Sequence, residues 1–241
     1  MQARDLMTAT ALGAPPLATG TPTDRRLGRW SARTIAVLAL FYAVAVVLGF
    51  VALGDVVRPL PDPYLAVAEL LILVMAPAMV VLMAAIHAGA PAERRVLSLI
   101  AFGWMLLAAG LTMTVHGLEL TLGRPAPGPP TAGAPPLFGF DWPAVLYGVD
   151  IVAWDLMLGL SLLFAAAVFP GREHRLVRRG LALSGTLCLA GLVGPATDVM
   201  AWRALGIAGY AIVFPLTCLA LSRTFAEPGP GRPPRDRAPR G

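Results

Sequence analysis

The chain has 241 residues, of which 57% are hydrophobic and only 14% are charged, and its mean hydropathy is +0.71. Soluble domains are about 45–50% apolar and about 25% charged, so this composition excludes an ordinary soluble domain and predicts an integral membrane protein. The net charge of +5 comes from 19 basic residues, all of them arginine. Their distribution fits membrane topology, so no nucleic-acid partner is predicted.

Residues 1–29 mix Thr, Pro, Gly, Ala and Arg without a hydrophobic period, which predicts a disordered tail. Six apolar segments follow within residues 30–225, each close to the ~20 residues that cross a ~30 Å hydrocarbon core. Backbone groups in lipid must be paired within the segment, so each segment is predicted to be a helix. Residues 226–241 are rich in Pro and Arg and predict a second disordered tail. We place the helices near 34–54, 64–87, 95–118, 143–169, 179–200 and 203–223.

The predicted fold class is therefore all-α, a polytopic bundle of six transmembrane helices embedded in the lipid bilayer. An even number of spans puts both termini on one side of the membrane. That side carries sixteen of the 19 arginines, whereas the other side carries only Arg58, Arg124 and Arg203. Arginine accumulates in cytoplasmic loops, so both termini are predicted to be cytoplasmic. Lysine is absent while Ala, Gly and Pro are abundant, which is typical of a GC-rich bacterial genome and indicates a bacterial inner membrane.

The connector over residues 120–142, "LTLGRPAPGPPTAGAPPLFGFDW", is too rich in Pro and Gly to continue a helix. It divides the chain into three predicted helices plus three, and we expect it to lie over the outer mouth of the bundle. Many transporters are built from inverted repeats of this kind. The two halves of this chain show no convincing sequence match, so the arrangement alone does not predict transport.

Two carboxylates, Asp150 and Asp155, lie inside the fourth apolar segment. A carboxylate at helix-centre depth costs about 2.5–3.5 kcal/mol and normally faces the bundle interior with a partner. Five residues correspond to about 140° around an α-helix, so the two side chains are predicted to point to different places. Asp155 shares a face with Gly148 and Gly159, which favours helix bracing. Asp150 shares a face with Tyr147, which favours an outward-facing polar pocket.

The predicted ligand or proton pocket consists of Glu69, His116, Glu119 and Asp150, all near the outer ends of their segments. His116-x-x-Glu119 places an imidazole and a carboxylate on one helical face. Three readings stay open for this set: structural pairing at helix ends, a proton or substrate site using a histidine that titrates near neutral pH, or a transition-metal site formed by His116, Glu119 and Asp150.

Asp198 and Arg203 flank the short turn between the last two segments, and with Asp155 they are predicted to brace helices. The chain contains no G-x-x-x-x-G-K-[ST], H-E-x-x-H, G-x-S-x-G or C-x-x-C pattern, which removes the commonest enzymes recognisable from sequence. His87 and His116 are predicted at opposite membrane faces and cannot form a haem pair, so no cofactor is expected.

The function predicted from these residues is a non-enzymatic membrane protein with an outward-facing polar pocket that handles protons or a small solute. Two alternatives stay open: a metal-dependent intramembrane enzyme, and a structural or assembly partner in a membrane complex. Association as a homo-oligomer or with another membrane protein also stays open.

The sequences "YGVDIVAWDLMLGLSLLFAA", "SGTLCLAGLVGPA" and "GIAGYAIVFP" in the last three segments are similar to those of small bacterial six-helix membrane proteins of unassigned function. The resemblance covers roughly residues 30–225. It implies the same six-helix plan and implies no activity, no cofactor and no functional residue.

Overall fold

The computed structural model describes residues 20–54, 60–122 and 142–225, and within these ranges all regular secondary structure is helical. Six stretches are long and apolar enough to cross a membrane, so the chain is an integral membrane protein, and the number of predicted apolar segments is confirmed. The six stretches are Pro22–Leu53, Tyr64–Ala88, Ala92–Thr121, Val145–Ala166, Arg175–Thr197 and Met200–Thr224.

The first two spans are single helices, whereas the other four combine several helical elements. The first is α2 (Pro22–Leu53) and the second is α3 (Tyr64–Ala88). The third joins η1 (Ala92–Arg94) to α4 (Arg95–Thr121). The fourth contains α5 (Val145–Ile151), the π-helical segment η2 (Val152–Met157) and α6 (Leu158–Ala166). The fifth contains α7 (Arg175–Gly191) and α8 (Val193–Thr197). The sixth contains η3 (Met200–Trp202), α9 (Arg203–Ile207), a second π-helical segment η4 (Ala208–Val213) and α10 (Phe214–Thr224).

The helix α2 begins at Pro22 instead of near residue 34, so the prediction of a disordered tail over residues 1–29 is wrong for its last part. A capping box starts the helix: the Thr21 side chain accepts a hydrogen bond from the Asp24 backbone, and the Asp24 carboxylate accepts one from the Thr21 backbone. Pro22 suits the first helical position because its missing N–H needs no partner there. At 32 residues the helix is ~48 Å long, so its first turns extend beyond the hydrocarbon core.

Several predictions fall on residues outside the described ranges. These are most of the outer connector predicted over 120–142, the predicted tail 226–241, the first nineteen residues of the predicted N-terminal tail, and two of the three outer arginines, Arg58 and Arg124.

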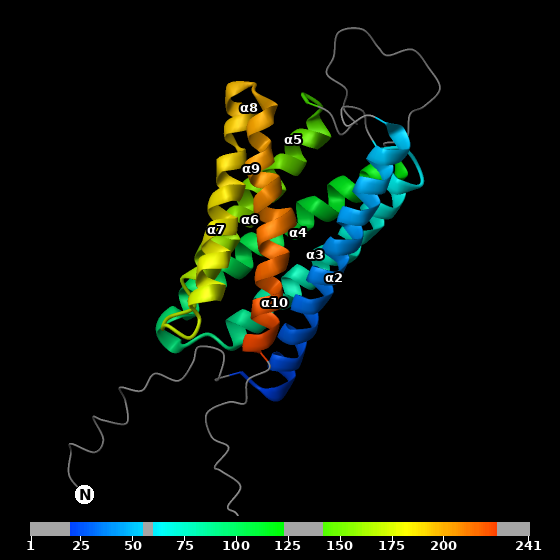
Figure 1. Ribbon diagram of the computed structural model, residues 1–241. Helices are drawn as coiled ribbons and strands as arrows, with labels where there is room; N and C mark the ends of the chain where they lie inside the picture. Colours follow the sequence, from blue (N-terminus) through cyan, green and yellow to red (C-terminus); the bar gives the residue numbers. More distant parts are fainter. Residues whose placement is uncertain (1–19, 55–59, 123–141, 226–241) are drawn as a thin grey trace, which may run out of the picture.

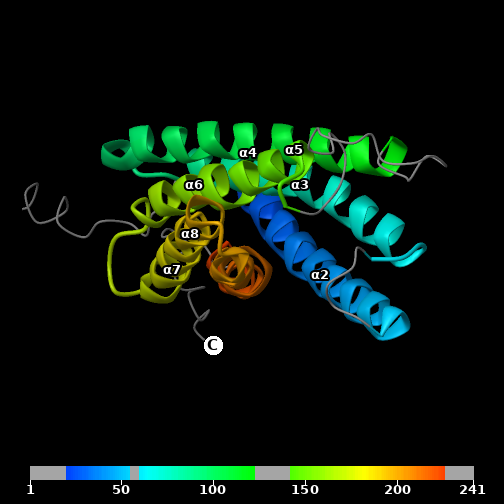
Figure 2. The same cartoon turned by 90° about the horizontal axis from the view of Figure 1, so that it is seen from above.

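Neighbouring spans pack side by side in a bundle (Figures 1 and 2). The helix α3 packs against α2 and α4, and α6 packs against α4 and α7. The helix α10 packs against both α2 and α7, which joins the first span to the last two. At this junction Gly28 in α2 faces the Phe225 ring, and a Cβ on Gly28 would lie 2.4 Å from two ring carbons. Only glycine allows this close approach.

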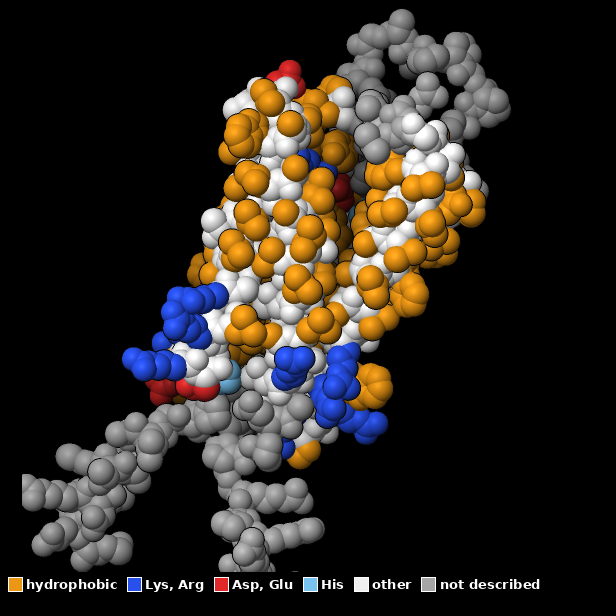
Figure 3. All heavy atoms as spheres, in the orientation of Figure 1, with side chains coloured by type: hydrophobic (Ala, Val, Ile, Leu, Met, Phe, Trp, Pro, Cys, Tyr) orange, Lys and Arg blue, Asp and Glu red, His pale blue; other side chains and the backbone are white. Residues whose placement is uncertain are grey.

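The bundle has two different ends. Basic side chains gather at the end formed by the starts of α2 and α7 and the last turn of α10 (Figure 3). We call this the arginine-rich end and the opposite one the far end. The half of the bundle nearer the arginine-rich end is filled by an apolar core that includes Leu82, Met105, Leu158 and Leu221, each fully buried. The far half is packed differently, because polar side chains lie inside it.

Candidate functional site

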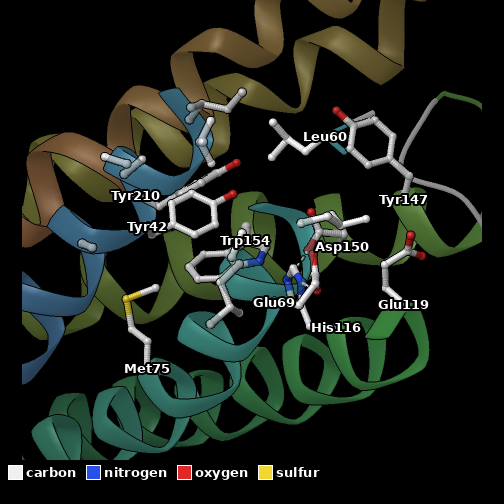
Figure 4. Close-up of a pocket in the computed structure, with 18 of the residues that line it drawn as sticks. Tyr42, Leu60, Glu69, Met75, His116, Glu119, Tyr147, Asp150, Trp154 and Tyr210 are labelled. Atoms are coloured by element: carbon white, nitrogen blue, oxygen red, sulfur yellow. Dashed lines mark hydrogen bonds and ion pairs between the residues drawn. The ribbon is translucent and has the colours of Figure 1, made fainter. Parts of the chain in front are cut away.

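A buried polar cluster centred on His116 occupies the far half of the bundle. The Nδ1 atom of His116 lies 2.5 Å from Oε2 of Glu69, and its Nε2 atom lies 3.3 Å from Oδ1 of Asp150. All three side chains are at least nine-tenths buried. One imidazole from α4 thus links a carboxylate from α3 to a carboxylate from α5 (Figure 4).

The three residues meet because they lie at the same depth. Each is five residues from the far end of its helix, or ~8 Å at a rise of 1.5 Å per residue. The helix ends are Tyr64 for Glu69, Thr121 for His116 and Val145 for Asp150. The structure therefore brings together three of the four residues that the sequence predicts for the pocket.

Arg203, at the start of α9, extends the cluster to the last span. Its Nη1 donates a hydrogen bond of 2.8 Å to the Tyr147 hydroxyl, and its Nη2 donates one of 3.2 Å to Oδ2 of Asp150. Its Nε lies 3.6 Å from Oδ2 of Asp155. The guanidinium carbon also lies 4.6 Å from the centroid of the Tyr147 ring, a distance that suits a cation–π contact. In addition to these contacts between helices, Arg203 lines the same cavity as Asp150.

The prediction that Asp150 and Asp155 point to different places is wrong, because one guanidinium contacts both carboxylates. The 140° separation assumed a regular α-helix, but Asp155 lies in the π-helical segment η2. A π-helix closes hydrogen bonds between residues five apart, so it moves residues five apart toward the same face. A π turn of this kind has no compositional signature, so the residue spacing gave the wrong relative direction for the two side chains.

Asp155 itself is fully buried and lies between two glycines of neighbouring helices. A Cβ on Gly206 would lie 2.3 Å from Oδ1 of Asp155, and a Cβ on Gly191 would lie 2.8 Å from its Oδ2. Two glycines of its own span, Gly148 and Gly159, were predicted to share its packing face. Gly159 packs against α7, where an added Cβ would lie 3.2 Å from the Gly185 carbonyl oxygen, whereas Gly148 faces open space. The close packing around this carboxylate is therefore made largely by glycines of the partner helices.

Glu119, the fourth residue of the predicted pocket, is buried, with 6% of its surface exposed. It lies one turn beyond His116 on α4, and both side chains line the same cavity. The Oε2 atom of Glu119 has no hydrogen-bond partner among the described residues. In Figure 4 its carboxylate lies apart from the contacts around His116, on the side of Tyr147. A buried carboxylate oxygen without a partner is costly unless it is protonated or meets a cation.

Of the three predicted bracing residues, Asp155 and Arg203 belong to this cluster. Asp198 lies away from it and does not line the cavity. It is exposed and adopts a left-handed conformation with φ 57° at the end of α8, which Asp tolerates better than most residues. Its Oδ1 accepts a hydrogen bond of 2.9 Å from Nε1 of Trp142. This contact joins the turn between the last two spans to the beginning of the fourth.

The cluster lines a cavity of about 650 Å³. The other walls are largely apolar and aromatic, and they come from α2, α3, η2, α9 and η4. Figure 3 shows an elongated hollow between α2 and the α9–α10 span, with acidic and basic side chains visible inside it. The volume falls within the range of ~300–1,000 Å³ that is usual for small-molecule sites.

The charged groups at the cavity do not balance within the part of the chain that the structure describes. Four carboxylates, from Glu69, Glu119, Asp150 and Asp155, meet only two groups that carry positive charge, the Arg203 guanidinium and the His116 imidazole when protonated. Uncompensated charge in a buried site is costly. The surplus carboxylates therefore need either protons or a cation.

A metal site from His116, Glu119 and Asp150 is not assembled in this geometry. Both ring nitrogens of His116 face carboxylate oxygens, of Glu69 and Asp150. Within residues 20–54, 60–122 and 142–225, His, Cys, Asp and Glu side chains form no group of three that could hold a metal ion.

Three aromatic residues at the cavity, Tyr42, Trp154 and Tyr210, were not among the predicted pocket residues. Tyr42 comes from α2 and Tyr210 from η4, so their approach to the cluster depends on long-range packing that sequence spacing does not predict. Trp154 carried a local signal, because it follows Asp150 by four residues and therefore shares its face.

No protein-family model, no protein among the curated proteins and no solved structure matches this chain.

Proposed function

We propose that this integral membrane protein binds protons and a small solute in the cavity of its far half, and that it is not an enzyme. The observation that carries the proposal is the surplus of buried carboxylates around His116 and Arg203. Intramembrane ionisable groups are expensive and commonly mark ion, proton or substrate pathways. A cluster used only for bracing has no need of carboxylates beyond those that its two basic groups can compensate.

The orientation is part of the proposal. Arginine accumulates on the cytoplasmic side of membrane proteins, so we place the arginine-rich end and both termini in the cytoplasm of a bacterial cell. The cavity then lies in the outer half of the inner membrane. The apolar core of the other half would then separate it from the cytoplasm, so in this conformation the cavity is closed toward the cytoplasm.

The proton part of the proposal is testable through Trp154, which lines the cavity beside Asp150. A variant that keeps Trp154 and replaces the other four tryptophans with Phe reports on the cavity by fluorescence. In liposomes we expect its emission to change with pH as the cluster gains or loses protons. Glu69→Gln and Asp150→Asn are expected to remove or shift this transition. Glu93→Gln, an exposed glutamate in η1 at the arginine-rich end, is the matched control and should leave it unchanged.

Correct folding of each variant is checked by circular dichroism and by a single peak in size-exclusion chromatography. If the fluorescence titration curves of the parent, Glu69→Gln and Asp150→Asn proteins are identical, the proposal is contradicted, because the transition then arises outside the cluster.

A further inference from the structure

The acidic cluster is only one side of the cavity, and the opposite side is aromatic. Tyr42 from α2, Trp154 from η2 and Tyr210 from η4 all line it. The rings of Trp154 and Tyr210 are 4.9 Å apart between centroids, and Figure 4 shows Tyr42 beside them, across the cavity from Glu119. Faces of Tyr and Trp attract cations through their quadrupoles. A cavity that presents both carboxylates and aromatic faces suits an organic cation, because the carboxylates compensate its charge and the rings contact its apolar groups.

Glu119 supplies the second, independent observation. Its side chain is buried, lines the cavity, and holds an oxygen without a hydrogen-bond partner among the described residues. Asp150 contacts Arg203, whereas Glu119 forms no ion pair with an arginine or histidine within the described ranges. It is therefore the carboxylate that a bound cation would compensate.

The cavity is also reached from the side of the bundle. Ala43 on α2 and Ile207 on α9 both line the cavity, and both are exposed on the surface of the bundle. The helices that carry them, α2 and α9, border the hollow seen in Figure 3. The helices α2 and α10 converge at the arginine-rich end, where Gly28 meets Phe225. The edges of the opening are apolar and lie within the hydrophobic spans, so the opening faces the lipid acyl chains.

From these features we propose that the solute is a monovalent organic cation with an apolar body, which reaches the cavity from the bilayer between α2 and α9. Its charge lies near Glu119 and Asp150, and its apolar body lies against Tyr42, Trp154 and Tyr210. A hydrated inorganic ion fits less well, because it leaves the apolar walls without contacts in a cavity of about 650 Å³. The inference rests on the proposed function of the same site and names its substrate class.

The test uses two probes of the same size and shape and opposite charge, tetraphenylphosphonium and tetraphenylborate. The full-length protein in phosphatidylglycerol nanodiscs is titrated with each probe, and the signal of protein-free nanodiscs is subtracted. We expect saturable, one-to-one binding of tetraphenylphosphonium and no saturable binding of tetraphenylborate. Equal binding of both ions, or of neither, overturns the proposal without the need for any variant.

The variant Glu119→Gln locates the charge. Loss of a charge-assisted contact weakens binding by about tenfold or more, so the dissociation constant for tetraphenylphosphonium is expected to rise by that factor. Glu93→Gln, the matched exposed control at the arginine-rich end, should bind as the parent does. Unchanged affinity in Glu119→Gln overturns the assignment of Glu119 as the counter-charge.

An ammonium headgroup of a membrane lipid offers the same chemistry as a free cation, and the nanodisc composition separates the two sources. Equal affinity with and without phosphatidylethanolamine supports a free solute. Loss of tetraphenylphosphonium binding when phosphatidylethanolamine is present identifies the lipid headgroup as the occupant and overturns the free solute. If no probe binds while the Trp154 titration still depends on Glu69 and Asp150, the substrate class is wrong and the proton-binding function stands.

Discussion

The ring of Trp154 lies 4.9 Å from the ring of Tyr210, inclined at 37°. Each residue lies in a π-helical segment, η2 and η4 respectively. π-helical turns are rare and frequently occur at functional sites, and here the two that the structure describes meet at the wall of one cavity. The contact therefore joins the fourth and sixth spans at the place where both depart from α-helical geometry.

Tyr210 is expected to contribute to binding through its ring. Tyr210→Leu removes the aromatic face and should weaken tetraphenylphosphonium binding by about two- to fivefold, because a cation–π contact contributes about 0.5–1 kcal/mol. Tyr210→Phe keeps the face and should bind nearly as the parent does. Calorimetric titration of the two variants in nanodiscs checks this prediction. A larger loss of tetraphenylphosphonium affinity in Tyr210→Phe than in Tyr210→Leu contradicts it.

Asp155 is expected to matter more for stability than Asp150. Asp155 is fully buried between Gly191 and Gly206, whereas Asp150 lines the cavity, where water can replace a lost contact. Removal of one partner from a buried ion pair costs about 3–5 kcal/mol, and Asp150 still compensates Arg203, so we expect about 2 kcal/mol for Asp155→Ala. Thermal unfolding in detergent should therefore give a lower midpoint for Asp155→Ala than for Asp150→Ala. The reverse order contradicts the bracing role.

The cradle around Asp155 gives a second stability prediction with an internal control. A Cβ at Gly206 would lie 2.3 Å from Oδ1 of Asp155, whereas a Cβ at Gly148 meets nothing within 4 Å. Gly206→Ala must displace the carboxylate from Arg203 and should lower the unfolding midpoint. Gly148→Ala gains up to about 1 kcal/mol of helix propensity and should leave the midpoint unchanged or raise it. Equal effects at the two positions would show that the cradle does not constrain the carboxylate.

The lateral opening gives a kinetic prediction. Ala43→Phe fills the edge of the opening on α2 and should slow the association of tetraphenylphosphonium from the bilayer several-fold. The rate is measured by stopped-flow quenching of Trp154 in the background in which the other four tryptophans are replaced. Val44→Phe is the matched control, because Val44 is exposed and does not line the cavity. Equal association rates in the two variants indicate that the cation arrives by another route.

The six spans could be predicted from the sequence because each is a long apolar run. Glu69, His116 and Asp150 could be placed near the outer ends of their segments because helical rise converts residue counts into distance, but their common depth came from the structure. The start of α2 was missed, although Thr21, Pro22 and Asp24 carry a readable capping box. Arg203 was predicted chiefly to brace helices, because its position beside a turn does not establish that its side chain also faces a cavity.

The remaining errors have a different origin. The relative direction of Asp150 and Asp155 depends on the π turn of η2, and composition does not distinguish a π turn from an α turn. The contributions of Tyr42 and Tyr210 depend on how the first and last spans pack against the others, which is a long-range property of the bundle.

The central claim is that protons and an organic cation compete for the same surplus carboxylates. The titratable groups that face the cavity, together with Asp155 beside them, are Tyr42, Glu69, His116, Glu119, Tyr147, Asp150, Arg203 and Tyr210. Tetraphenylphosphonium has no exchangeable proton, so any proton released when it binds comes from the protein.

The most direct measurement is therefore the pH change of a weakly buffered solution of the protein in nanodiscs when tetraphenylphosphonium is added to saturation. We expect acidification in proportion to bound cation, because the cation replaces protons on the carboxylates, and a smaller release in Glu119→Gln. Saturable binding without any proton release would contradict the claim.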